Sequence, residues 1–379
     1  MKIGIDIGST TIKYVVMDGE KKFLHKDYSR HFSEIGTALT NTLSTLKNIV
    51  GETKFKIALA GSAGMGIAKK ISLPFVQEVI ACQTAVEEFI PKTETVIELG
   101  GEDAKIIYLK GAPEVRMNGV CAGGTGSFID HMASLLSTDA LGLNSLAEKG
   151  KQIYTIASRC GVFAKTDIQA LMNDGAKKAD IALSIFQAVV NQTIGNLAQG
   201  RPIEGVVAFL GGPLHFLPEL KKRFIETLHL TPEQTIVPES AHLLVAKGAA
   251  LDSLNNNPIS VQKLKSKIDV LRNSQDTTTK PLAPLFSIDA EYEEFKERHS
   301  KAKVKRKDFK NFSGDCFIGI DAGSTTTKLA IIDSDGNLLH SIYKSNEGDP
   351  LNSVINMLKE VYYILPQNAK IRYSGVTGY

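Results

Sequence analysis

The sequence predicts an α/β fold, followed by a linker and the start of a second copy. Three observations support this prediction. Short runs rich in β-branched residues are interrupted by clustered glycines, helix-like stretches lie between these runs, and GIDIGSTTIK from Gly4 returns as GIDAGSTTTK from Gly319. Strand patterns that alternate with helical patterns are typical of sheets covered by helices.

Composition indicates an ordinary globular protein. The chain has 379 residues, 43% of them hydrophobic and 22% charged, which is enough for two or three domains with a sizeable core. The net charge is only +3, so no strong field favours nucleic acid or an acidic membrane. The basic block 298–310 follows an acidic run, which is typical of a solvated linker. Apolar runs such as GVVAFLGG are too short to span a bilayer.

The first element, KIGIDIGSTTIKYVVMDGE, predicts two strands joined by a glycine turn. Such a loop can point successive backbone N–H groups at an anion. Asp6 lies beside the loop and could hold Mg²⁺ through water, and Lys13 adds a positive charge. A plain hairpin without a ligand is the alternative. The expected phosphate-binding residues are Gly8, Ser9, Thr10, Thr11 and Lys13.

The next elements carry a second glycine turn. A helix is expected over 35–50, a buried strand within KIALAGSAG, and a helix that holds Glu78 and Cys82. The run TVIELGGEDAKIIYL then places Gly100 and Gly101 inside an apolar stretch. The flanking carboxylates are placed to bind a metal or to orient a water; these are Glu98, Glu102 and Asp103.

Two cysteines stand immediately before predicted helices. Cys121 lies in VCAGGTGSFIDHM and Cys160 in SRCGVFAKTDIQAL. The positive end of a helix stabilises thiolates and an anionic iron-sulfur cluster. Two thiolates cannot hold a four-iron cube alone, but a symmetric dimer would supply the other two. The alternatives are buried, inert cysteines and a zinc site, which the absence of CxxC or HxxxH spacing disfavours.

The remaining elements complete the module. A long helix is expected around 181–197, then the strand VVAFLGG, a helix near 217–228 and the closing helix AHLLVAKGAALDSL. An adenine ring could lie against the bare backbone of Gly211, Gly212 and Pro213. Residues 255–315 change to loop and charged sequence, which predicts a linker or an ornament packed on the first domain.

The three glycine turns, in this order, resemble the actin, hexokinase and Hsp70 ATPase superfamily. That resemblance implies a ribonuclease H-like fold whose two lobes clamp ATP and Mg²⁺. It places an actin-like ATPase module at 1–254, with lobe I at about 1–92 plus 241–254 and lobe II at about 93–240. The linker is then 255–315, and 316–379 is the incomplete N-terminal part of a second module.

A narrower resemblance rests on EVRMNGVCAGGTGSFIDHMA, SRCGVFAKTD and ELGGEDAK. These stretches are similar to ATP-dependent activators of 2-hydroxyacyl-CoA dehydratases and to benzoyl-CoA reductase ATPase subunits. The resemblance implies a 4Fe–4S cluster held by Cys121 and Cys160 and shared by a homodimer. It also implies electron transfer from ferredoxin or flavodoxin to a dehydratase or reductase. The linker and repeated DAGSTTTK resemble members with two modules in tandem.

The sequence departs from this family's pattern at the second glycine turn. The family has aspartate and glutamine where this chain has Glu98 and Glu102. By resemblance, the catalytic residues are Glu102, Asp103 and Asp6, and the magnesium ligands are Asp6 and Glu98. Cys82 and Cys316 are expected in the core. Irregularly spaced cysteines favour a reducing, cytoplasmic setting.

Two other functions stay open on the sequence. A small-molecule kinase of the same superfamily would use a catalytic aspartate, for which Asp103 could serve, and its cysteines would be incidental. A non-catalytic nucleotide switch would close on ATP without moving an electron. ATP turnover that depends on an added acceptor favours the kinase, and negligible turnover with retained affinity favours the switch.

Overall fold

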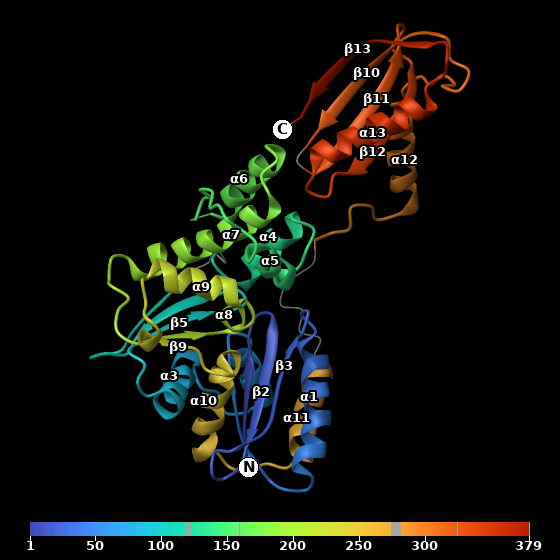
Figure 1. Cartoon of the computed structure of the whole chain (residues 1–379). Helices are drawn as coiled ribbons and strands as arrows, with labels where there is room; N and C mark the ends of the chain where they lie inside the picture. Colours follow the sequence, from blue (N-terminus) through green and yellow to red (C-terminus); the bar gives the residue numbers. More distant parts are fainter. Residues whose placement is uncertain (119–122, 159, 274–281, 324, 379) are drawn as a thin grey trace. The chain divides into compact units, whose positions relative to one another are not determined.

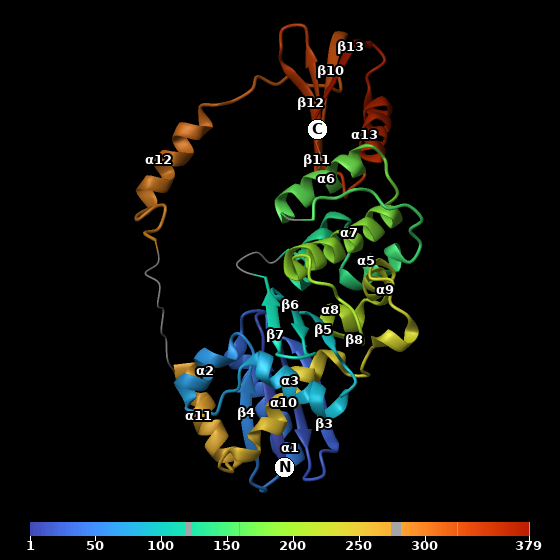
Figure 2. The same ribbon diagram turned by 90° about the vertical axis from the view of Figure 1, so that its left-hand side faces the viewer.

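The computed structural model describes residues 1–118, 123–158, 160–273, 282–323 and 325–378, and Figures 1 and 2 show its elements. The chain divides into two compact units. The first comprises Met1–Ser134, Thr138–Lys165 and Ala179–Gln275. The second comprises Leu135–Ser137, Thr166–Lys178 and Asp276–Tyr379.

The first unit opens with a four-stranded sheet in the order β3-β2-β1-β4. β1 pairs antiparallel with β2 and parallel with β4, which confirms the predicted hairpin around the first glycine turn. Every residue of β1 is buried because helices cover both faces. The strands are β1 (Lys2–Ile7), β2 (Thr11–Met17), β3 (Phe23–Arg30) and β4 (Lys56–Ala60); the helices are α1 (Ile35–Val50), α2 (Gly64–Ile71), α3 (Glu78–Phe89), α10 (Leu244–Asp252) and α11 (Val261–Asn273).

Side-chain alternation along β1 explains its two faces. Ile3, Ile5 and Ile7 pack in one core with leucines that recur at helical spacing on α1. Leu264 and Ile268 of α11 are buried in the same core. The first part of the predicted linker 255–315 is therefore a helix packed on the first sheet, as in the alternative of an ornament.

The opposite face of β1 receives α10 at very close range. A Cβ on Gly4 would lie 2.0 Å from the carbonyl oxygen of Ala246 and 2.4 Å from the amide nitrogen of Ala250. Glycine inside a strand marks such a close approach between backbones. The small residues along α10 serve the same contact, since a larger side chain would hold the helix away from the sheet.

The second sheet of this unit has five strands in the order β7-β6-β5-β8-β9. The strands are β5 (Thr95–Leu99), β6 (Ala104–Tyr108), β7 (Glu114–Met117), β8 (Val207–Leu210) and β9 (Thr235–Ile236). The helices of this part of the chain are α4 (Gly126–Leu135), α5 (Ala140–Ala147), α6 (Gly161–Asn173), α7 (Lys178–Thr193), α8 (Gly212–Phe216) and α9 (Pro218–Thr227). Together, β5 and β8 place the second and third glycine turns beside each other, because these two strands are parallel neighbours.

One helix among the described residues, Lys178–Ala198, is long and apolar enough to cross a membrane. Its most apolar stretch is 72% buried within the structure. A buried core helix of a globular protein has the same length and composition, so this is weak evidence for a membrane span.

The second unit contains a four-stranded sheet in the order β12-β11-β10-β13, which matches the first sheet strand for strand. Its strands are β10 (Gly314–Ala322), β11 (Thr326–Asp333), β12 (Leu338–Ser345) and β13 (Ala369–Thr377), and its helices are α12 (Asp289–Ser300) and α13 (Pro350–Ile364). The pairing Asp6↔Lys13 in the first sheet recurs as Asp321↔Lys328 in this one. The sequence repeat is therefore also a repeat of topology and register.

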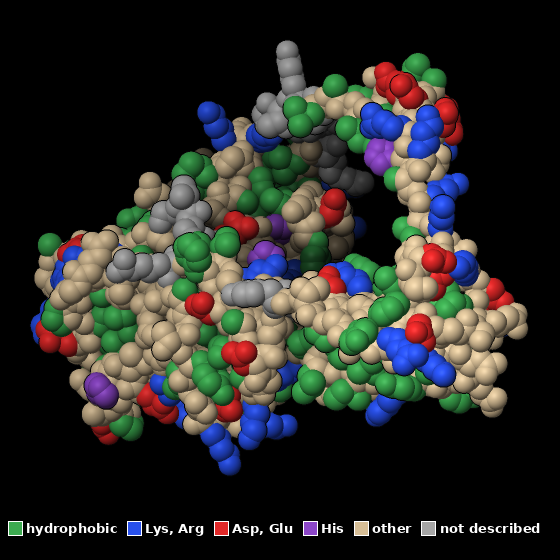
Figure 3. Space-filling view, turned by 90° about the horizontal axis from the view of Figure 1, so that it is seen from above, with side chains coloured by type: hydrophobic (Ala, Val, Ile, Leu, Met, Phe, Trp, Pro, Cys, Tyr) green, Lys and Arg blue, Asp and Glu red, His purple; other side chains and the backbone are tan. Residues whose placement is uncertain are grey.

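Charged side chains are dispersed on the surface. α12 buries none of its residues, as expected for the solvated charged stretch. On the face shown in Figure 3, acidic and basic side chains are interspersed among the coloured residues. On this face the distribution agrees with the small net charge.

Candidate functional site

A cleft of about 400 Å³ in the first unit is lined by the first glycine turn and strands β2 and β3 on one side, and by glycine turns and helices next to the second sheet on the other. Small-molecule sites typically measure roughly 300–1,000 Å³. The cleft combines backbone-rich glycine turns with one lysine, one arginine and several apolar side chains. Its lining is Thr10, Thr11, Lys13, Tyr28, Arg30, Gly100, Gly101, Gly126, Ser127, Ile129, Asp130, Ala140, Leu141, Gly212, Pro213, Phe216 and Leu217.

The first glycine turn is closed by a hydrogen bond from the Gly8 amide to the Thr11 carbonyl, at 2.9 Å. Lys13 Nζ donates to Asp6 Oδ2 at 2.7 Å, and both side chains are largely buried. Burial disfavours the Lys13 ammonium, but attraction to Asp6 outweighs it and raises the pKa of Lys13. Lys13 therefore stays charged and is held beside the loop by Asp6.

The second glycine turn joins β5 to β6 and touches the first. A Cβ on Gly101 would lie 2.3 Å from Thr10 Oγ1, so this approach requires glycine. The carbonyls of Gly100 and Gly101 accept hydrogen bonds from the Gly126 and Ser127 amides, at 3.0 and 2.7 Å. These two bonds join the second turn directly to the N-terminus of α4.

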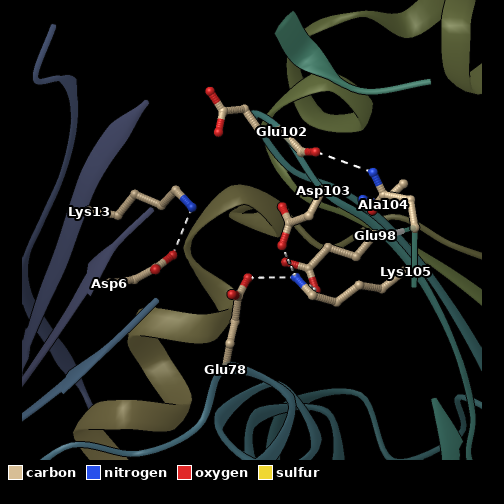
Figure 4. Close-up of polar contacts among 9 residues, drawn as sticks. Asp6, Lys13, Glu78, Glu98, Glu102, Asp103, Ala104 and Lys105 are labelled. Carbon is tan, nitrogen blue, oxygen red and sulfur yellow. Dashed lines mark hydrogen bonds and ion pairs between the residues drawn. The ribbon is translucent and has the colours of Figure 1, made fainter. Parts of the chain in front are cut away.

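Behind the second turn, Lys105 lies among three carboxylates (Figure 4). Its Nζ is 2.7 Å from Glu78 Oε1, 2.7 Å from Asp103 Oδ2 and 4.0 Å from Glu98 Oε2. Burial, and then the charge of Glu98, raises the pKa of Glu78 to about 7. Burial also raises the pKa of Glu98. We define Glu78, Glu98, Asp103 and Lys105 as the Lys105 cluster.

Two carboxylate oxygens beside the cleft suit a hard cation. Among the described residues, Asp6 Oδ1 and Glu98 Oε2 are buried and have no hydrogen-bond partner. Mg²⁺ binds through one or two protein carboxylates and otherwise keeps water or phosphate oxygens. The absence of a denser group of three metal-ligating side chains in the described chain is compatible with that mode. The residues predicted for Mg²⁺ therefore fit it chemically.

The third glycine turn opens α8 beside a group of rings. Tyr28 and Phe216 both line the cleft, and their centroids are 5.3 Å apart. His242 lies behind them, 5.1 Å from the Phe216 ring. Burial, and then the neighbouring His215, lowers the pKa of His242 to about 3, so this ring is neutral. A flat ligand ring can contact the aromatic edge next to Gly212 and Pro213.

The family model described as "BadF/BadG/BcrA/BcrD ATPase family" matches residues 3–271. The chain belongs to this ATPase family.

Relatives of this ATPase have activator names. The 2-hydroxyisocaproyl-CoA dehydratase activator of Clostridioides difficile is 29% identical over 279 residues, which are 70% of this chain and 98% of the relative. The (R)-2-hydroxyglutaryl-CoA dehydratase activating ATPase of Acidaminococcus fermentans is 29% identical over 218 residues, or 55% of this chain and 82% of that one.

Solved structures share the fold of this ATPase. Component A of the Acidaminococcus fermentans dehydratase matches with a TM-score of 0.59 and 24% identity, covering 70% of this chain and 98% of its own. The Clostridium difficile 2-hydroxyisocaproyl-CoA dehydratase activator with bound ADPNP matches with a TM-score of 0.56 and 22% identity, covering 75% and 99%. The chain thus has the α/β actin-like ATPase fold.

The structure brings together many of the residues that the sequence singled out in this ATPase. Thr10, Thr11, Lys13, Gly100, Gly101, Gly212 and Pro213 line the cleft. Gly8, Ser9 and Gly211 belong to the same turns but are not part of its lining. Asp6, Glu98 and Asp103 lie in the ion pairs beside it, and Glu102 is exposed and points away from Lys105 in Figure 4.

Sequence reasoning missed several cleft residues. Tyr28 and Arg30 lie two apart on β3, so the period of a strand places both on one face. Asp130 is in the first turns of α4, and its Oδ2 is 2.9 Å from Nη1 of Arg30. A polar or aromatic residue at every second position of an outer strand was the available signal.

The cysteines of this ATPase differ in position. Cys121 lies outside the described residues. Cys160 is half-buried and directly precedes α6, and its carbonyl accepts the Ala164 amide at 3.0 Å. Cys82 and Cys316 are fully buried, as expected for core residues. Burial raises the pKa of the Cys82 thiol well above its ordinary value, which keeps it protonated and unreactive.

Proposed function

We propose that this chain is an ATP-dependent activator that passes a low-potential electron to a 2-hydroxyacyl-CoA dehydratase or a related reductase. The main observation in support of the proposal is the pair of hydrogen bonds between the start of α4 and the second glycine turn. Gly126 and Ser127 donate to Gly100 and Gly101, and Cys121 precedes this helix in the sequence. A phosphate-dependent movement of the turn would therefore move the helix that follows Cys121.

In this proposal the two glycine turns bind the phosphates of ATP, with Lys13 as their counter-charge. Asp6 and Glu98 would hold Mg²⁺, which supplies charge neutralisation on the phosphates when bound. Glu102 is the exposed carboxylate of the second turn and orients the attacking water. Asp103, which pairs with Lys105, fixes the shape of the turn.

Cys121 and Cys160 would hold a 4Fe–4S cluster together with the same two residues of a twin subunit, and this cluster supplies one-electron chemistry when bound. Cys160 stands at the positive end of α6, which favours a thiolate. Ferredoxin or flavodoxin is the proposed donor. Each ~100 mV against which one electron moves costs about 2.3 kcal/mol, whereas one coupled binding event contributes about 1–3 kcal/mol. Closure of the cleft on ATP, together with ATP hydrolysis, fits this requirement better than ATP binding alone.

We also propose that residues 316–379 are the N-terminal part of a second ATPase module. The repeated motif, the equal strand order and the pair Asp321–Lys328 at 2.7 Å support this assignment. The setting we propose is cytoplasmic. A kinase would need Asp103 as a base, and its ion pair with Lys105 gives that role no support.

The cluster is tested on protein purified without oxygen. Iron and sulfide analysis, with electron paramagnetic resonance of the dithionite-reduced protein, is expected to detect a four-iron cluster in the native chain. The double variant Cys121→Ser and Cys160→Ser is expected to lose the cluster and keep nucleotide binding. Cys316→Ala is the matched control, because this cysteine is buried in the second unit.

A double variant that keeps its iron would refute the cysteine assignment. A native chain that binds Mg-ATP but contains no iron would instead favour the nucleotide switch, and turnover that requires an added small acceptor would favour the kinase.

A further inference from the structure

The turn between β3 and α1 is hydrogen-bonded to the backbone of the first glycine turn, which is the proposed phosphate loop. The His31 amide donates to the Thr10 carbonyl at 3.2 Å, and His31 Nε2 lies 3.0 Å from the Gly8 carbonyl. The His31 side chain is only 4% exposed. His31 itself does not line the cleft, so it acts on the loop from outside the ligand space.

The partners of the His31 ring define its tautomer. The Ser33 amide lies 3.1 Å from Nδ1, and an amide can only donate. Nδ1 is therefore the acceptor, and the proton is on Nε2, which donates to Gly8. Both ring nitrogens are thus used, one to hold the loop and one to hold the turn.

The turn has an unusual backbone. Phe32 has φ 46° and Ser33 has φ 66°, so two successive residues other than glycine are left-handed. Such conformations persist where the surrounding contacts require them, and they cluster at functional sites. Here they bring the Ser33 amide back to the His31 ring, and the Glu34 amide to the His31 carbonyl at 2.7 Å.

The second unit builds the same turn with a different residue. Asn346 stands where His31 stands: its amide donates to the Thr325 carbonyl at 3.0 Å, and its Nδ2 to the Gly323 carbonyl at 2.6 Å. The Gly348 amide donates to Asn346 Oδ1 at 3.1 Å, and the Asp349 amide to the Asn346 carbonyl at 2.8 Å.

The backbone of this turn is repeated as well, since Glu347 and Gly348 have φ 50° and 76°. A coincidence of packing would not preserve four hydrogen bonds and two left-handed residues while the side chain changes from imidazole to amide. What His31 and Asn346 share is one donor and one acceptor at matching positions.

We propose that His31, and in the second unit Asn346, is a positioning residue that sets the direction of the phosphate-loop amides. This proposal rests on the proposed nucleotide site. The C=O of one residue and the N–H of the next point in opposite directions in a trans peptide. The His31 ring holds the Gly8 carbonyl, which directs the Ser9 N–H away from it. The backbone amide of His31 holds the Thr10 carbonyl, which does the same for the Thr11 N–H. Thr10 and Thr11 line the cleft, so this is the orientation that an anion needs.

The first test needs no nucleotide. Hydrogen–deuterium exchange of the full chain is followed in peptides that cover 31–34 and 346–349. His31→Leu removes donor and acceptor and is expected to speed exchange in 31–34 by about tenfold, while His31→Asn stays within about threefold of the native chain. Asn346→Leu is the matched variant and is expected to change only 346–349.

The second test measures the native protein. In full-length chain labelled with ¹⁵N-histidine, nuclear magnetic resonance is expected to find the His31 proton on Nε2, with the signal assigned by its loss in His31→Asn. A proton on Nδ1 overturns the proposal whether or not any variant folds. Equal exchange in His31→Leu and native chain, or equal acceleration in His31→Asn and His31→Leu, also overturns it.

The third test is titration calorimetry with Mg-ADP. His31→Leu is expected to weaken binding about tenfold, and His31→Asn to restore it to within about threefold. A residue needed only for packing would not be rescued by the smaller amide. If the native chain binds no Mg-ADP, the proposed function fails. The hydrogen–deuterium exchange and the His31 tautomer then still test the positioning role.

Discussion

At the scale of single residues, the Lys105 cluster is where charge and burial oppose each other. Three carboxylates surround one ammonium that is itself 2% exposed. Attraction to these carboxylates outweighs the effect of burial and raises the pKa of Lys105, so the lysine stays charged. One of the acids then retains its proton near neutral pH, and Glu78 has the raised pKa that this requires.

Glu78→Gln is predicted to flatten the dependence of stability on pH. The pKa of Glu78 rises from 4.5 to about 7 on folding, so its contribution is fully present below pH 4.5 and is lost as pH rises through 7. Thermal unfolding between pH 4.5 and 8 is expected to show a smaller fall in Tm for Glu78→Gln than for the native chain. The control is Glu52→Gln at an exposed position outside the cluster; equal slopes in all three proteins would contradict the prediction.

At the scale of elements, glycine decides how closely α10 approaches β1. The two sheets offer a matched comparison, because Gly319 occupies the place of Gly4 and has no heavy atom within 4 Å of its Cβ position in the described structure. The same residue therefore meets backbone in one sheet and open space in the other.

Gly4→Ala is predicted to destabilise the first unit by about 2 kcal/mol or more, because the new methyl would overlap Ala246 and Ala250. Gly319→Ala is expected to leave stability unchanged or to raise it by about 0.5 kcal/mol, because alanine loses less entropy in a strand. Urea unfolding of both full-length variants measures this difference. Equal losses would show that α10 does not pack on Gly4 as described.

At the scale of the whole molecule, the sequence predicted the order of elements well. The hairpin, the helix at 35–50 and the three glycine turns are confirmed because local periodicity and turn chemistry specify them. The cleft was predictable only where a glycine turn supplied it. Arg30, Asp130 and Phe216 enter it through tertiary packing. Alternation along β3 groups Tyr28 and Arg30 on one face, but it does not specify that this face lines the cleft.

The packing of α11 was the hardest part of the fold to predict. Its apolar residues are few and follow the polar stretch NNNP, so composition resembles that of a linker. Leu264 and Ile268 nevertheless complete the core beside α1. Two apolar residues one helical turn apart are enough to hold α11 in place when the neighbouring groove is already formed. That groove cannot be seen in the sequence.

The packing of α10 on Gly4 also means that one face of the first sheet is covered late in synthesis. β1 leaves the ribosome about 240 residues before α10, an interval on the order of tens of seconds at typical elongation rates. All five strands of the second sheet emerge within that interval, since they end at Ile236. The strands of the first sheet are thus synthesised first, but its Gly4 face stays uncovered in the nascent chain until residues 244–252 arrive.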